Sequence, residues 1–199
     1  MTVNPADDKS KTAVAFPLII VDFGGLTEAQ LLGAAKVLRD ALAHVPSGYQ
    51  AEGAAEAEVA ARRGETDWLG FAALHDERLV GWIGAIKVYA HGWEIHPLVV
   101  APDRQRQGVG SALLAVLEAH AHCEGAATLF LGTDDDYGGT TLFDVDLWPD
   151  VLSHARSAEV TERGHALAFY RCHGYAVVGV LPDVNGLGRH DVLMAKRLG

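Results

Sequence analysis

The stretch Leu98-Val-Val-Ala-Pro-Asp-Arg-Gln-Arg-Gln-Gly-Val-Gly110 decides how this chain folds, because it joins a strand to a helix through a glycine-containing loop. The first N–H groups of a helix have no partner inside the helix, and they lie at the positive end of its dipole. Gly108 and Gly110 lack a Cβ that would keep a phosphate away, and Arg104 and Arg106 can add charged contacts. The stretch therefore predicts a diphosphate site at the start of a helix.

Other glycine loops are less consistent with these residues. A lone Gly-x-Gly could belong to an ordinary strand-to-helix turn. A Walker loop requires Gly-Lys-Ser/Thr, and a dinucleotide fold requires Gly-x-Gly-x-x-Gly followed by an acidic residue. Neither pattern is present in the stretch.

The apolar pattern predicts one α/β domain, with a mixed sheet and helices on its faces. The polar turn Asp76-Glu77-Arg78 between two apolar runs predicts a hairpin. Strands are expected over residues 14–21, 68–75, 79–89, 94–100, 128–132, 175–181 and 192–196, and helices over residues 27–42, 52–63, 111–122, 151–156 and 165–172.

Length and composition fit a single cytoplasmic domain. The 199 residues are 49% hydrophobic, and no apolar run approaches the roughly 20 residues that a membrane span requires. Residues 1–12 are polar and lack the basic start and apolar centre of a signal peptide. We expect a disordered segment over 1–12 and one domain over 13–199.

The net charge indicates which ligands the chain favours, and the cysteines and histidines indicate whether disulfides or a metal site are expected. The formal net charge of −10 disfavours nucleic acid and favours a cationic small molecule. Cys123 and Cys172 are too few for a disulfide framework, so we expect buried, reduced thiols. No metal is expected, because His120, His122 and Cys123 do not share a helix face in a ligand pattern. A nucleophilic pair of Cys172 and His165 is also rejected.

Two motifs resemble those of the GCN5-related N-acetyltransferases, abbreviated GNAT. Gln105-x-x-Gly108-x-Gly110 after a strand resembles their acetyl-CoA signature, and Ala166-Leu-Ala-Phe-Tyr170-Arg-Cys-His-Gly174-Tyr175 resembles their second motif. The resemblance implies a single mixed, mostly antiparallel sheet flanked by helices, with acetyl-CoA in a splayed cleft between two central strands. It assigns coenzyme binding to Leu98, Val99, Val100, Gln105, Arg106, Gln107, Gly108, Val109, Gly110, Ser111 and Tyr170.

The same resemblance suggests catalytic roles. Tyr170 would protonate the departing thiolate, because a phenol is neutral at working pH and can donate one proton. Taken alone, Phe169 and Tyr170 would be interpreted as core aromatics. The backbone N–H of Leu98 would hold the thioester carbonyl, where negative charge develops. Pro97 cannot donate to a strand ladder and predicts the bulge that would free this N–H.

A narrower resemblance points to the aminoglycoside 6′-N-acetyltransferases. The segments Gly92-Trp-Glu-Ile-His-Pro-Leu-Val-Val100 and Leu131-Gly-Thr-Asp-Asp135 carry it, and it covers residues 79–198 while residues 13–69 correspond only loosely. Trp148 stands where a tyrosine is usual, and His190 stands where a proline is usual. The segment before Phe169 also lacks a proline and an aromatic residue, and these departures concern the shape of the acceptor pocket.

Glu94 and His96 are two residues apart on a strand, so both side chains face the same side. The resemblance places that side toward the acceptor, with Glu94 as the base that deprotonates the ammonium and His96 nearby. The alternatives are an exposed strand glutamate and a core histidine bonded to a carbonyl.

An acidic segment follows the 128–132 strand. Residues 132–150 contain six Asp and no Lys or Arg, and Asp134, Asp135 and Asp136 are expected to bind a polycation. Solvated turns are the alternative, and the alternating acids of a calcium loop fit poorly.

The favoured function is therefore acetyl transfer from acetyl-CoA to an aminoglycoside amine, the 6′-amine in particular, which would give antibiotic resistance by removing a positive charge and a donor from the drug. A polyamine, a protein N-terminus or a lysine stays open as the acceptor. A non-catalytic acetyl-CoA-binding module is a further alternative. The family resemblance also implies a homodimer.

Overall fold

The computed structural model describes residues 14, 16–45 and 48–199, so the segment 1–12 expected to be disordered lies outside the described residues. One seven-stranded sheet, in the order β1-β2-β3-β4-β5-β7-β6, organises the described chain. Its strands are β1 Ile19–Asp22, β2 Trp68–His75, β3 Arg78–Ile86, β4 Gly92–Val100, β5 Thr128–Asp134, β6 Ala176–Leu181 and β7 Asp191–Arg197.

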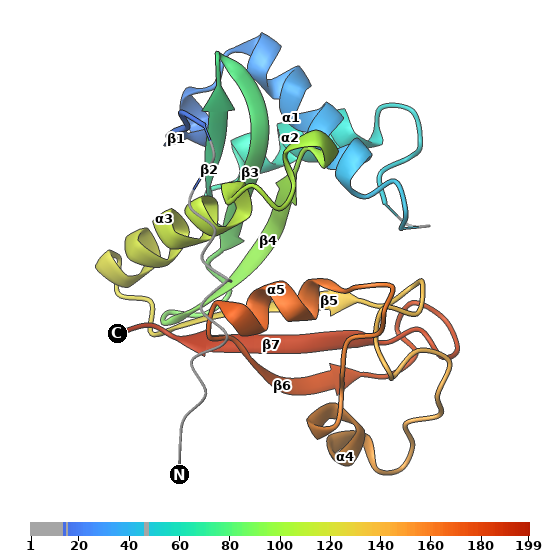
Figure 1. Ribbon diagram of the computed structural model, residues 1–199. Helices are drawn as coiled ribbons and strands as arrows, with labels where there is room; N and C mark the ends of the chain where they lie inside the picture. Colours follow the sequence, from blue (N-terminus) through green and yellow to red (C-terminus); the bar gives the residue numbers. More distant parts are fainter. Residues whose placement is uncertain (1–13, 15, 46–47) are drawn as a thin grey trace, which may run out of the picture.

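Helices cover both faces of this sheet (Figure 1). The N-terminal half carries a core on each face, and Ala34, Leu38 and Val59 pack against Trp82 on one of them. On the other face, Leu113 and Leu117 belong to a larger core that continues under the C-terminal half. The helices are α1 Glu28–Ala41, α2 Ala54–Gly64, α3 Val109–Cys123, α4 Val151–Arg156 and α5 Ala166–Cys172, with short 3-10 turns η1 Phe23–Gly25 and η2 Pro102–Arg104. The fold class predicted from the sequence is confirmed.

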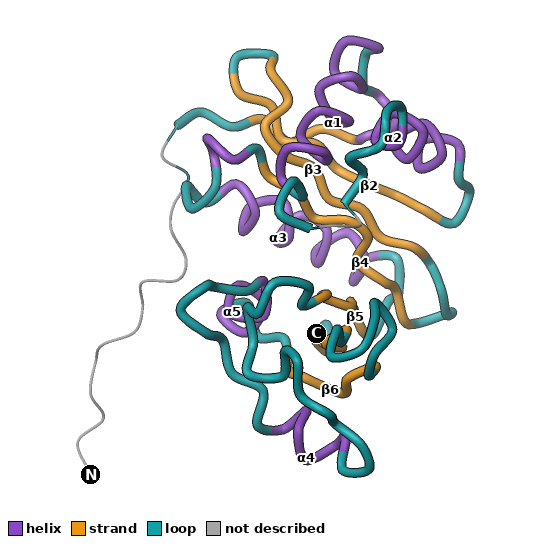
Figure 2. Tube along the Cα trace, turned by 90° about the vertical axis from the view of Figure 1, so that its right-hand side faces the viewer, coloured by secondary structure: helices purple, strands orange, loops and turns teal. Residues whose placement is uncertain are grey.

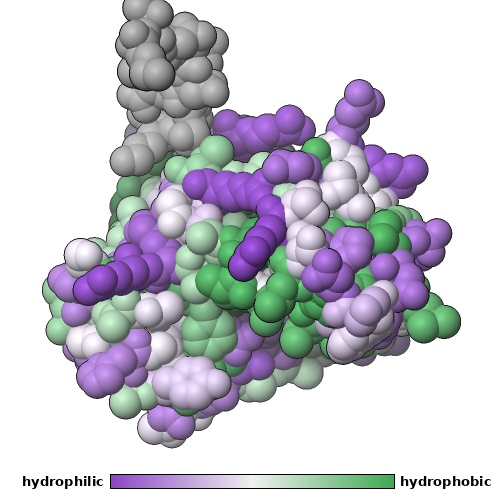
Figure 3. Space-filling model, turned by 90° about the horizontal axis from the view of Figure 1, so that it is seen from below, coloured by the Kyte–Doolittle hydropathy of each residue, from purple (hydrophilic) through white to green (hydrophobic). Residues whose placement is uncertain are grey.

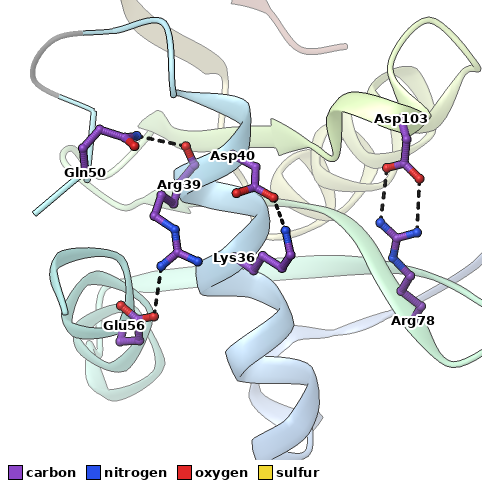
Figure 4. Close-up of polar contacts among 7 residues, drawn as sticks. All are labelled: Lys36, Arg39, Asp40, Gln50, Glu56, Arg78 and Asp103. Carbon is purple, nitrogen blue, oxygen red and sulfur yellow. Dashed lines mark hydrogen bonds and ion pairs between the residues drawn. The ribbon is translucent and has the colours of Figure 1, made fainter. Parts of the chain in front are cut away.

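Local chemistry explains where α1 begins. Thr27 accepts a hydrogen bond from the backbone N–H of Gln30, and the Gln30 side chain accepts one from the N–H of Thr27. This capping box satisfies two of the N–H groups that a helix start leaves open. Arg39 of α1 also contacts Glu56 of α2 at 3.3 Å, and Gln50 donates to the carbonyl of Arg39, so the two helices are held together (Figure 4).

The hairpin predicted around Asp76 is also present. Asp76 and Glu77 both have positive φ, 47° and 63°, as a two-residue turn between paired β2 and β3 requires. Arg78 then donates two hydrogen bonds, of 3.1 and 3.2 Å, to the carboxylate of Asp103 in η2 (Figure 4). This bidentate pair fixes the tip of the hairpin to the chain just before the glycine loop.

The sheet opens at its centre, between β4 and β5. These strands run parallel but pair only from Gly92 to Glu94 on β4 and from Thr128 to Phe130 on β5. Beyond that point β4 stays with β3 and β5 stays with β7, so the two halves of the sheet diverge (Figures 1 and 2). We call this opening the splay.

Two expectations about details need correction. The first strand was expected over 14–21 but is assigned to Ile19–Asp22, where pairing with β2 begins. Cys123 and Cys172 are free but exposed rather than buried. Each is the last residue of its helix, beyond the buried positions Ala121 and Tyr170. Within the described residues, no helix is both long enough and apolar enough to cross a membrane.

Candidate active site

The expected bulge lies where β4 enters the splay. Ile83 of β3 is opposite Leu98, whereas Ala85 is opposite Ile95, so two steps along β3 correspond to three along β4. The extra residue falls at His96 and Pro97, and it reverses the side-chain alternation. Because of this, Ile95 and Leu98 both pack into the core that contains α3.

The start of α3 is open to an anion. Gly108 precedes the helix with a φ of 87°, and within the described residues no side chain caps the first turn. The side chain of Gln105 instead donates to the carbonyl of Val100 at the end of β4, at 3.2 Å, and that of Gln107 donates to the carbonyl of Asp103, at 2.9 Å. Arg106 has a φ of 57°, which is a left-handed conformation. This conformation is energetically unfavourable for any residue that carries a Cβ. The loop thus presents unpaired N–H donors and the exposed Arg106 on its outer side.

These residues fit acetyl-CoA. The uncapped first turn supplies donors for a pyrophosphate, and the splay leaves β4 backbone beyond Glu94 without a partner on β5 for a pantetheine arm. The eleven residues expected to hold the coenzyme lie on β4, on this loop, in the first turn of α3 and on α5. The role of these residues in coenzyme binding is a proposal.

Tyr170 lies on α5, close to the start of α3. Its neighbour Phe169 comes within 3.5 Å of a Cβ added at Gly110, so the two helices meet at the glycine loop. Tyr170 is 7% exposed, and burial raises the pKa of its phenol well above the ordinary value. The hydroxyl therefore keeps its proton at neutral pH, as a general acid must.

The opposite face of the sheet gathers carboxylates. Glu94 is in register with Phe130, and Asp134 is directly opposite Asp191, so strand alternation puts Glu94, Asp134 and Asp191 on one face. His96 shares this face and its Nε2 lies 3.4 Å from Glu58 of α2. We call Glu94, Asp134 and Asp191 the acidic face.

Asp191 is the member of the acidic face that the sequence reasoning missed. Its Oδ1 is buried and has no hydrogen-bond partner among the described residues. Its carboxylate lies over Gly132, where an added Cβ would overlap it. Burial, and then repulsion from Asp134 and Glu94, raise the pKa of Asp191 to about 6. An acidic residue directly before the apolar run 192–195 was the only signal in the sequence.

The aspartates of the acidic loop after β5 have different environments and therefore different roles. Asp135 is fully buried and accepts hydrogen bonds of 2.7 to 2.9 Å from the N–H groups of Gly138, Gly139 and Thr140 and from the Thr140 hydroxyl. Asp135 therefore shapes the loop, and its expected contact with substrate is corrected. Asp134 is exposed, and Asp136 is half-buried with a pKa raised by burial and by Asp134.

The two halves of the molecule meet again at the rim of the acidic face. The ring of Tyr137, in the acidic loop, lies 5.1 Å from the ring of His44, which follows α1. His190, the departure noted before Asp191, is fully buried, accepts from the N–H of Asp183 and donates to the carbonyl of Val145. These contacts fix the loops that border the acidic face.

Comparison with known proteins identifies the family. The profile of the acetyltransferase (GNAT) family matches residues 37–140, which include β4, the glycine loop and α3. The chain belongs to the GNAT family. As a member, it uses acetyl-CoA as the acetyl donor, and the expectation drawn from the two motifs is confirmed.

Solved structures give a narrower similarity for this GNAT protein. A crystal structure of an aminoglycoside 6′-N-acetyltransferase with coenzyme A is 36% identical, with a TM-score of 0.82, and the match covers 91% of this chain and 97% of that one. The aminoglycoside 6′-N-acetyltransferase from Enterococcus faecium is 35% identical, with a TM-score of 0.79 and the same coverage. The ribosomal-protein-S18-alanine N-acetyltransferase from Escherichia coli, at 18% identity, a TM-score of 0.63 and coverage of 92% and 95%, shares the fold.

A search of curated protein sequences gives no match. Among the described residues, no group of three or more His, Cys, Asp or Glu side chains is arranged to hold a metal ion.

Proposed function

We propose that this GNAT enzyme acetylates the 6′-amine of aminoglycosides and thereby confers resistance. The observation that carries the proposal is the acidic face beside the splay, and above all the buried Oδ1 of Asp191, which has no hydrogen-bond partner among the described residues. Two carboxylates placed directly opposite each other on neighbouring strands repel, which costs stability unless a cation lies between them. An aminoglycoside brings several ammonium groups. The similarity to enzymes of that activity supports the same acceptor.

In this proposal, groups on one face of the sheet act on the acceptor amine, and groups at the splay and on the other face act on the thioester. When bound, acetyl-CoA supplies an acetyl thioester whose carbonyl carbon can accept an amine and whose sulfur can leave. Glu94 takes the proton from the substrate ammonium, directly or through water, with His96 beside it. The N–H of Leu98 stabilises negative charge at the acetyl oxygen. Tyr170 gives its hydroxyl proton to the sulfur.

Substrate binding is assigned to Glu94, His96, Asp134 and Asp136, with Asp191 added and Asp135 removed. No acceptor contact is assigned to Glu58, because its carboxylate is already paired with Arg62. The distance from Glu58 Oε1 to Arg62 Nε is 2.7 Å. His96 is then oriented between Glu58 and the acceptor.

The experiment that tests the acceptor measures release of the CoA thiol. Acetyl-CoA is supplied with aminoglycosides that carry a 6′-amine, with an analogue that has a 6′-hydroxyl instead, and with a polyamine and a basic peptide. We expect turnover with the 6′-amino drugs and its loss on the 6′-hydroxyl analogue. Turnover with the polyamine or peptide alone would replace the proposed acceptor, and CoA binding without any turnover would reject the enzymatic role.

The role of Glu94 predicts a pH-dependent defect in Glu94→Gln. Turnover with a 6′-amino drug should fall about 100-fold at neutral pH, where the amine is protonated and needs a base. The loss should shrink at high pH, where free amine is present. Steady-state rates between pH 6 and 9.5 measure this, with Glu77→Gln on the exposed hairpin turn as a control. A profile parallel to that of the wild type would remove Glu94 from this role.

The quaternary state belongs to the same proposal. β6 is an edge strand of the sheet, and Val178 and Leu181 on it are 60% and 45% exposed. Val184 and Leu187 in the following loop are 55% and 89% exposed. Apolar side chains on an edge strand favour pairing with another chain, so we propose that β6 forms the interface of a homodimer. The cytoplasmic location stays a prediction.

A further inference from the structure

His173 has contacts that the proposed mechanism does not use. It directly follows α5, and its ring reaches the first turn of α3. Its Nε2 lies 3.0 Å from Ser111 Oγ, and its Nδ1 lies 2.8 Å from the carbonyl oxygen of Phe169. The imidazole therefore joins α5 to a residue of the first α3 turn, where the pyrophosphate of acetyl-CoA is expected.

The Phe169 carbonyl fixes the polarity of this hydrogen-bond chain. A carbonyl oxygen only accepts, so Nδ1 of His173 must carry a proton. In the neutral ring Nε2 then has a lone pair and accepts the hydroxyl proton of Ser111. The Ser111 oxygen is left with lone pairs alone, which repel a phosphate oxygen.

Protonation reverses the second hydrogen bond. An imidazolium donates from both nitrogens, so Nε2–H now donates to Ser111 Oγ. The hydroxyl proton of Ser111 is then free to point toward an anion at the helix start. A positive charge also arrives beside the first turn of α3, where it adds to the helix dipole.

We propose that His173 is a positioning residue that acts through Ser111 on the phosphate groups of acetyl-CoA, so that protonation of the imidazole tightens coenzyme binding. The proposal concerns the coenzyme half of the site. It does not depend on which amine is acetylated.

The charged groups on the surrounding elements leave His173 as the switching group. Glu118 of α3 is paired with Lys196 of β7 at 2.7 Å, and Arg171 of α5 is paired with Glu159 at 3.0 Å. Burial raises the pKa of Tyr170 and of Tyr175, so both stay neutral. The remaining groups on these elements and on the glycine loop are Asp103, which is paired with Arg78, the cations Arg104, Arg106 and Arg197, the helix-end residues His120, His122 and Cys123, and the exposed thiol of Cys172. Asp191 of β7, with a pKa of about 6, lies opposite Asp134 on the acidic face and not at the start of α3.

The test measures binding alone, with no acceptor present, so its failure is separate from failure of the proposed acetyl transfer to aminoglycosides. Isothermal titration calorimetry gives the Kd of dephospho-CoA between pH 5.5 and 8.5. This ligand lacks the 3′-phosphate, which itself titrates near pH 6. For the wild type we expect Kd to rise roughly three- to tenfold from the lower to the higher pH.

Three variants separate the proposed role from simple packing. His173→Gln keeps a side-chain donor at every pH and should bind without this pH dependence. His173→Leu should also lose the dependence and bind about as weakly as the wild type does at pH 8.5. Ser111→Ala removes the hydroxyl but keeps the imidazole charge, so it should bind more weakly at low pH and show a smaller pH dependence than the wild type. If these variants keep the wild-type slope, His173 only ties α5 to α3 and the proposal is wrong.

A second readout does not depend on variants. NMR titration of the His173 ring should show its pKa rising when dephospho-CoA binds, because binding and protonation must favour each other equally. Identical titration of the ring in free and bound protein would overturn the proposal. Far-UV circular dichroism and thermal unfolding establish that each variant is folded.

Discussion

At the residue scale, the carboxylate of Asp191 lowers the stability of the free protein and favours binding of a cationic acceptor. Burial and Asp134 raise its pKa to about 6 in the folded protein, above the ordinary value of an aspartate. The folded state therefore holds this proton more tightly than the unfolded state does. The destabilisation that Asp191 causes is absent below about pH 4, grows as the pH rises from 4 to 6 and stays constant above that. A bound ammonium would recover the lost free energy by pairing with the carboxylate.

Asp191→Asn should therefore stabilise the protein and weaken acceptor binding. At pH 7.5 we expect the free energy of unfolding to rise by about 1 to 2 kcal/mol, allowing for solvent screening, and the gain should vanish near pH 4. Urea unfolding at both pH values measures this, with Glu162→Gln on the exposed surface as a control. Calorimetry with a 6′-amino aminoglycoside should give a weaker Kd. A variant that is less stable at pH 7.5, or that binds the drug as tightly, contradicts this account.

At the element scale, the loop into α3 combines backbone strain with an open helix start. Arg106 holds a φ of 57°, which glycine adopts without steric cost. Arg106→Gly and Arg106→Ala both remove the charge, and each should weaken CoA binding about three- to tenfold. Only the glycine variant also relieves the strain, so it should be more stable than the alanine variant by about 1 kcal/mol. Thermal unfolding and CoA titration separate the two effects, and equal stability of the pair would show that the loop carries no strain.

At the scale of the whole molecule, hydrophobic side chains come to the surface between hydrophilic ones on the side seen in Figure 3. Val178 and Leu181 on the β6 edge strand are the exposed apolar residues assigned to the dimer interface. We expect sedimentation velocity to give a dimer for the wild type and a monomer for Val178→Glu/Leu181→Glu, with CoA binding retained. Leu32→Glu on α1, also exposed, should stay dimeric. A wild-type monomer at every concentration, or a dimeric double variant, would remove this interface.

The sequence by itself determined the features that a few neighbouring residues encode. Thr27 and Gln30 close the start of α1, Asp76 and Glu77 form the hairpin turn, and Pro97 marks the bulge. Each depends on hydrogen bonds or allowed backbone angles within one turn, so the residue types are enough. The glycine loop before α3 was predictable for the same reason, and with it the family and the coenzyme.

Only the tertiary structure decided which distant side chains meet. Asp191 joins the acidic face because β7 pairs antiparallel with β5 in a register that puts it opposite Asp134. Asp135 turns inward because three consecutive backbone N–H groups converge on it, and His173 reaches Ser111, 62 positions away in the chain, because α5 packs on α3. Strand register and helix packing are set by burial of the whole apolar surface, so no local pattern can specify these contacts.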